Sequence, residues 1–279
     1  MKPMLLFLLL IETCFRPSRP NPDTAPQSNL PQPDTLLCQR FAPPPGFERP
    51  AVDSGSFAFH LRHLPLKPPG SRVLLFNGLE KSRSDVYEAV VDLPIGNQDL
   101  HQCADAVIRL RAEYLWQAGR FNEIHFNLTN GFRVDYNRWR KGERVKVSGN
   151  KTSWVAQKTA SGTYATFWQY LEFVFTYAGT LSLSKELQQV DVAEMKIGDV
   201  FIQGGAPGHA VIVVDLAVDS SGKKVFLLAQ SYMPAQEIQV LKKTANGTIS
   251  PWYSVEFGER LETPEWTFNK GDLKRFREE

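Results

Sequence analysis

Short apolar segments in the second half of the chain, separated by turn residues, constrain its fold most strongly. They are residues 199–202, 210–218, 224–231 and 237–241. Segments of this length that are rich in Val, Ile, Leu and Phe are typical of buried strands, and short connections favour antiparallel neighbours. The sequence therefore predicts a mostly antiparallel sheet here. Residues 252–257 predict one more strand, and residues 270–279 a charged tail.

Helices and further strands are predicted in the first half of the chain. Apolar spacing predicts a helix over residues 56–64, and strands are predicted over residues 73–76, 86–93 and 123–128. Residues 164–177 are long enough for a helix but are apolar on almost every side, which indicates a buried helix or the wall of a groove. The predicted fold class is therefore α+β.

A long helix is also predicted between the expected strands at residues 86–93 and 123–128, and it ends near Gly119. Asp99 with Gln102 three residues later resembles a capping box, and Cys103 and Val107 continue one apolar stripe. Cys103 would then lie in the first turn, where unpaired backbone N–H groups and the helix dipole favour a thiolate over a thiol. This position makes Cys103 a candidate nucleophile.

His209 is the best candidate for the proton partner of that thiol. It follows the glycine-rich loop 204–208, which can hold its ring at the mouth of a cleft. Asp215 is too far to orient the imidazole, at roughly 20 Å along a strand that rises ~3.3 Å per residue. The antiparallel segment 224–231 returns Gln230 or Ser231 beside His209, and the amide oxygen of Gln230 is the better acceptor for the second ring N–H.

These residues resemble the NlpC-type branch of the papain-like cysteine peptidases and amidases, many of which cleave bacterial cell-wall peptides. The resemblance lies in Cys103 at a helix start, residues 198–201 (Gly-Asp-Val-Phe) and residues 208–212 (Gly-His-Ala-Val-Ile), in that order. It implies a papain-like domain whose Cys-bearing helix packs on the sheet, with Cys103, His209 and Gln230 as the catalytic residues. Gln102 departs from the aspartate that usually precedes the cysteine.

The chain is also similar to an exported bacterial family called domain of unknown function 4846. This resemblance lies in residues 102–107 (Gln-Cys-Ala-Asp-Ala-Val) and residues 229–236 (Ala-Gln-Ser-Tyr-Met-Pro-Ala-Gln), and it extends over nearly all of residues 46–241. It implies export and brings no established activity.

The N-terminal residues predict export. Residues 1–14 have the form of a signal peptide, with Lys2 before a short apolar run, and Cys14 lies where a lipoprotein would carry its lipid. Residues 15–45 are rich in proline and predict a semi-rigid linker to a single globular domain over residues 46–279. The expected location is the cell envelope, with lipid attachment, plain secretion and an uncleaved anchor as alternatives.

Charge and cysteine content argue against several classes of function. The net charge is +2 and the charged residues are interspersed, so no basic stripe suited to nucleic acid is present. Cys14 and Cys38 precede the predicted domain and Cys103 lies alone within it, which predicts neither a disulfide framework nor a CxxC metal pair. No HExxH motif occurs, so a metallohydrolase is disfavoured and no cofactor is expected.

Two function classes remain open. A thiol hydrolase would cleave an amide bond in an envelope peptide or a peptidoglycan stem. A non-catalytic module on the same scaffold would bind glycan, lipid or a partner protein, and Cys103 would then be a small core residue. Aromatic residues of segment 136–140 could stack on sugar rings, and the basic cluster from Arg133 to Arg144 could contact an anionic polymer or lipid.

Overall fold

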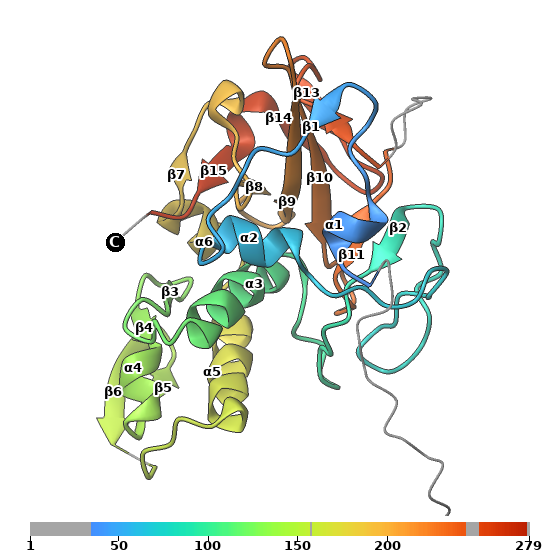
Figure 1. The fold of residues 1–279 in the computed structure, drawn as a ribbon. Helices are drawn as coiled ribbons and strands as arrows, with labels where there is room; N and C mark the ends of the chain where they lie inside the picture. Colours follow the sequence, from blue (N-terminus) through green and yellow to red (C-terminus); the bar gives the residue numbers. More distant parts are fainter. Residues whose placement is uncertain (1–34, 157, 244–250, 278–279) are drawn as a thin grey trace, which may run out of the picture. The chain divides into compact units, whose positions relative to one another are not determined.

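The computed structural model describes residues 35–156, 158–243 and 251–277 (Figure 1). They belong to one compact unit. Leu37 is fully buried and Phe41 nearly so, which shows that residues before Gly46 also pack into it. The predicted leader, including Cys14, lies outside the described residues.

Nine strands form one sheet within the described residues. They are β1 (Phe47–Glu48), β2 (Tyr87–Val90), β7 (Gln188–Gln189), β8 (Val200–Gln203), β9 (His209–Asp219), β10 (Lys224–Gln230), β11 (Gln239–Leu241), β12 (Tyr253–Ser254) and β15 (Leu273–Arg275). The main path runs β2-β11-β10-β9-β8-β15-β7, while β1 pairs with β9 and β12 with β10. Their pairings are antiparallel, which confirms the α+β class with a mostly antiparallel sheet.

Helices and small two-stranded hairpins make up the rest of the described structure (Figure 1). The helices are α1 (Leu37–Arg40), α2 (Phe57–Arg62), α3 (Cys103–Gln117), α4 (Tyr136–Arg140), α5 (Tyr164–Tyr177) and α6 (Thr180–Glu186), with 3₁₀ turns η1 (Val192–Glu194) and η2 (Lys270–Asp272). The hairpins pair β3 (His125–Asn127) with β4 (Arg133–Asp135), β5 (Glu143–Ser148) with β6 (Lys151–Ala156), and β13 (Arg260–Glu262) with β14 (Thr267–Asn269).

Strand β9 is buried on both faces because alternate side chains enter two different cores. Ile212 and Val214 join the core that contains α2 and α3, whereas Val211 and Val213 join a second core with residues of the β13–β14 hairpin. The pairing of β9 with β10 shifts register between Leu227 and Leu228. Burial on both faces explains why residues 210–214 of this strand are continuously apolar instead of alternating.

Helix α5 buries one face and leaves its two ends exposed. Its aromatic residues are distributed around the helix, so only some of them lie on the buried face. Phe167 and Tyr170 are fully buried, whereas Tyr164 and Tyr177 are exposed. Tyr170 contacts the rings of α4, with Tyr136 at 5.2 Å and Trp139 at 5.8 Å between centroids. Tyr136 and Trp139 are themselves buried, so these two rings belong to the core and are not available to stack on sugar rings.

Two local predictions were wrong. Residues 73–76 make isolated bridges and not a strand, since Leu74 pairs with Glu80 and Leu75 with Gln236. The expected charged tail instead supplies β15, which inserts between β8 and β7. No helix in the described ranges combines the length and apolarity needed to cross a membrane.

Candidate active site

Cys103 is the first residue of α3 and is nearly buried, with 9% of its surface exposed. The N-cap is Gln102, whose backbone N–H donates to Asp105 Oδ2 at 3.0 Å. Asp99, the expected cap, instead accepts a hydrogen bond from the backbone N–H of Ala235 at 2.7 Å. Helix α3 therefore begins at Cys103 itself, so the thiol lies at the N-terminal end of the helix.

The thiol lies beside the strand that carries the histidine. Helix α3 contacts β9, and the backbone of Ala210, which directly follows His209, lowers the pKa of the Cys103 thiol. Tyr232 interacts electrostatically with Cys103, and its ring centroid is 4.9 Å from that of His209. The starts of α3 and β9 thus meet at one place, although residues 103 and 209 are far apart in the sequence.

His209 is held by one hydrogen bond and three aromatic rings. Its Nε2 lies 2.8 Å from Gln230 Oε1, and its ring centroid is 5.3 Å from Trp266 and 6.0 Å from Phe268. The side chain is 2% exposed. Gln230 therefore lies where the antiparallel return of β10 predicted it, against the imidazole.

A carboxylate fixes the orientation of the Gln230 amide. Gln230 Nε2 donates to Glu265 Oε2 at 2.7 Å, and Lys81 Nζ donates to both oxygens of Glu265 at 2.8 and 2.9 Å. Since an ionised carboxylate only accepts, Gln230 must direct its oxygen toward His209. His209 then carries its proton on Nε2, which leaves Nδ1 unprotonated and able to accept a proton.

Two glycines of the recognised motifs are required by close packing. A Cβ on Gly208 would lie 2.4 Å from Thr180 Oγ1 and 2.6 Å from a backbone oxygen, so the residue before His209 cannot carry a side chain. Gly198 has φ +95°, and a Cβ there would lie 2.9 Å from the Phe57 ring. The following Asp199 accepts two hydrogen bonds from Arg275, which ties β15 to β8. The Gly-Asp part of the motif is thus structural.

Three residues at the site were not found from the sequence. Lys81 comes from an irregular segment, Glu265 from the turn between β13 and β14, and Tyr232 from the residues after β10. Each is placed by tertiary folding and not by any local pattern. Tyr232 belongs to residues 229–236, which carry the resemblance to domain of unknown function 4846, and this resemblance is the sequence signal that indicated the site.

Burial makes both reactive groups neutral at physiological pH. Desolvation, reinforced by Asp105, raises the pKa of the Cys103 thiol to about 11 despite backbone hydrogen bonds that lower it. Desolvation lowers the pKa of His209 to about 4, and the nearby Lys81 charge lowers it further, while the bond to Gln230 raises it. The backbone N–H groups at the helix start do favour the thiolate, as expected, but burial outweighs them.

Alkylation of Cys103 by iodoacetamide is accordingly expected to be slow at neutral pH. Only the thiolate reacts, so with a pKa of about 11 the rate should rise about tenfold for each pH unit up to pH 10. The measurement is the second-order rate in a Cys14→Ser, Cys38→Ser background, because Cys38 is also a free, half-buried thiol. Fast alkylation at pH 7 that collapses in His209→Ala would contradict this and indicate a resting ion pair.

The remaining histidines do not form a metal site. His101 is buried and its Nδ1 lies 3.3 Å from the Gln236 backbone oxygen, while His63 Nδ1 bonds the Phe59 backbone oxygen at 2.8 Å. His125 Nε2 lies 4.0 Å from Glu186 Oε1, a partner that was not anticipated. Within the residues that the structure describes, no three His, Cys, Asp or Glu side chains are grouped as metal ligands.

Comparison with known proteins gives one informative result. The family model described as domain of unknown function (4846) matches residues 37–275. Neither a curated protein nor a solved structure matches the chain. The matched residues begin at the first residue of α1, include every strand of the central sheet, and contain Cys103, His209 and Gln230. The chain is therefore a member of the family called domain of unknown function 4846.

Proposed function

We propose that this protein is a thiol hydrolase with a papain-like arrangement of Cys103, His209 and Gln230. The observation that carries the proposal is the bonded pair of His209 and Gln230, with His209 on β9, the strand that contacts the helix whose first residue is Cys103. Nucleophile, base and orienting group come from three separate elements. This is the set of roles that activated-cysteine chemistry requires.

The resting neutral pair defines the first step. As a substrate amide binds, the Cys103 sulfur attacks the carbonyl carbon and its proton passes to His209 Nδ1. The imidazolium then returns this proton to the leaving amine, the C–N bond breaks and a thioester forms on Cys103. Water, deprotonated by His209, hydrolyses the thioester. Backbone N–H groups at the start of α3 supply positive potential for the oxyanion.

The proposed substrate is an amide bond in a cell-envelope peptide or a peptidoglycan stem, and the proposed location is the cell envelope. Both rest on the sequence: the NlpC-like motifs at residues 198–201 and 208–212, and the apolar leader followed by Cys14. Purified stem peptides incubated with the full-length protein should yield new amino groups, detected by amine labelling and mass spectrometry. Release that is equal in a Cys103→Ala variant would overturn the proposal.

A non-catalytic binding module is the second candidate, and the burial of the site favours it. Cys103 and His209 are 9% and 2% exposed, and their pKa values of about 11 and about 4 keep both uncharged. This candidate predicts that stem peptides or glycan fragments bind but are recovered intact. Calorimetry combined with product analysis distinguishes the two, since the hydrolase must also consume what it binds.

Glu265 is expected to act as a positioning residue in the proposed hydrolase. Replacement by alanine frees the Gln230 amide to rotate, so His209 loses its fixed tautomer. A hydrogen bond to a charged group contributes roughly 1.5–3 kcal/mol, so we expect kcat/KM to fall about 10- to 100-fold. The imidazole ¹⁵N shifts of His209 should move toward a mixture of tautomers.

The matched control is Glu262→Ala in the same hairpin. Glu262 is exposed at the end of β13, so its loss should leave both kcat/KM and the His209 shifts unchanged. Unchanged His209 shifts in Glu265→Ala, with reduced thermal stability only, would show that Glu265 stabilises the fold without orienting the imidazole.

A further inference from the structure

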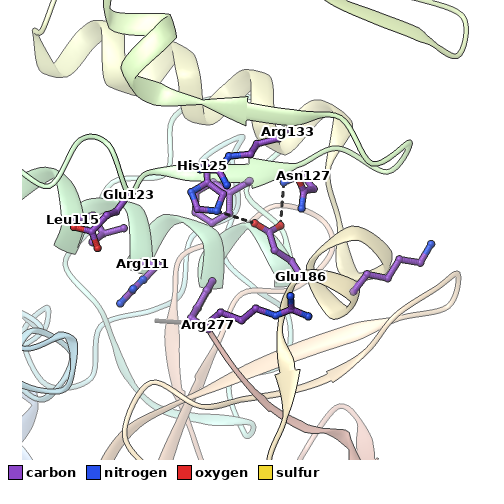
Figure 2. Close-up of a pocket in the computed structure, with 11 residues that line it drawn as sticks. Arg111, Leu115, Glu123, His125, Asn127, Arg133, Glu186 and Arg277 are labelled. Carbon is purple, nitrogen blue, oxygen red and sulfur yellow. Dashed lines mark hydrogen bonds and ion pairs between the residues drawn. The ribbon is translucent and has the colours of Figure 1, made fainter. Parts of the chain in front are cut away.

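A polar cavity of about 230 Å³ lies at the far end of α3 from Cys103 (Figure 2). Helix α3, hairpin β3–β4, helix α6 and the C-terminal segment surround it. Its basic side chains are Arg111, Arg133, Lys185 and Arg277, against two acidic ones, Glu123 and Glu186. Figure 2 shows Arg111, Arg133 and Arg277 on different sides of this space. The lining thus carries an excess of positive charge.

The two acidic residues are already engaged. Glu123 pairs with Arg120, which lowers the pKa of the Glu123 carboxyl. Glu186 Oε2 accepts the backbone N–H of Asn127 at 3.0 Å. Among the described residues, by contrast, Lys185 and Arg277 form no ion pair and are exposed. The cavity is therefore suited to an anionic group such as a phosphate or carboxylate.

A second, mostly apolar cavity of about 490 Å³ adjoins the first. Its walls include Ala51, Ile197 and Leu216, its charged lining residues include Lys196 and Lys224, and its volume is in the range typical of small-molecule sites. Arg111 and Phe276 line both cavities. The Arg111 guanidinium lies 5.2 Å from the Phe57 ring centroid and 5.4 Å from that of Phe276, so it is held by aromatic contacts at the boundary.

We propose that the two cavities together bind a single-chain anionic amphiphile. The apolar chain occupies the larger cavity, and the anionic headgroup lies in the smaller one, against Arg111, Lys185 and Arg277. Charge complementarity selects the headgroup, and burial of methylene groups supplies affinity along the chain. The site is independent of the proposed hydrolase, since Arg111 lies about 12 Å from Cys103 along the helix at ~1.5 Å per residue.

The test is calorimetry of the full-length protein with decyl phosphate below its aggregation concentration. We expect one equivalent to bind, at least about tenfold more tightly than inorganic phosphate or uncharged decyl maltoside, because each lacks one half of the recognised structure. Equal affinity for either comparator would overturn the proposal. Binding to phosphatidylglycerol vesicles without binding of monomeric decyl phosphate would also overturn it, in favour of a membrane surface.

Substitutions at two exposed positions each disable one half of the proposed site. Ala51→Trp fills the apolar cavity without changing charge, and Lys185→Gln removes one cation from the polar cavity. Each should weaken decyl phosphate binding about tenfold or more. Lys151→Gln, which removes an exposed cation at the β5–β6 hairpin, should have no effect. Unchanged affinity in both site variants would place the binding elsewhere and overturn the proposal.

Discussion

Replacement of Asp215 by asparagine is expected to lower the free energy of unfolding by about 3–5 kcal/mol, the cost typical of breaking a buried ion pair. Asp215 is fully buried on β9, and its two oxygens lie 2.8 Å from Arg62 Nε and 2.7 Å from Arg49 Nε. An amide cannot balance either guanidinium, and Arg62 has almost no access to water. These pairs also fasten α2 and the segment after β1 onto the sheet.

The measurement is urea unfolding followed by tryptophan fluorescence, which should show a lower midpoint with an unchanged slope. Asp85→Asn is the matched control. Asp85 pairs with Arg83 through exposed side chains, and exposed pairs contribute little because water and salt screen them. Equal midpoint shifts in the two variants would show that Asp215 is not the electrostatic anchor of this part of the fold.

The central sheet could be predicted because its strands carry their own signal. Segments 210–218 and 224–231 are mostly apolar and joined by a short turn, and they form β9 and β10. The predicted antiparallel return also places Gln230 beside His209, as the structure shows. Strand β15 could not be predicted, since it is only three residues long and two of them, Lys274 and Arg275, are charged.

The orienting groups of the site could not be predicted for a different reason. Lys81 and Glu265 are separated by 184 residues and meet only in the folded chain, so no spacing along the sequence connects them. The protonation state of Cys103 could not be predicted either. The sequence correctly predicts its position at the helix start, but the pKa of its thiol depends on burial by neighbours that a helix pattern does not reveal. Local patterns thus indicated the proposed reactive residues, whereas tertiary packing determines their protonation.

Loss of either reactive group should abolish the proposed hydrolysis. In Cys103→Ser the weaker nucleophile, and in His209→Ala the missing proton acceptor, should each reduce kcat/KM for stem peptides by about 10³-fold or more. Gln230→Ala should cost less, because it orients the base and does not transfer a proton. The double variant of Cys103 and His209 should be no slower than the worse single variant, since residues that act as a unit are not additive.

The pH profile of the wild-type protein tests the same assignment without a mutation. His209 must be neutral to accept the thiol proton, and its pKa is about 4. We therefore expect kcat/KM to be flat from about pH 5 upward and to fall about tenfold per unit below pH 4, as the protonated fraction grows. A resting thiolate–imidazolium pair would instead give a bell-shaped profile with two limbs near neutral pH. A bell-shaped profile would contradict the neutral-pair mechanism but would leave Cys103 and His209 as the proposed reactive groups. The hydrolase proposal itself depends on a different observation, the loss of activity in the Cys103→Ser and His209→Ala variants.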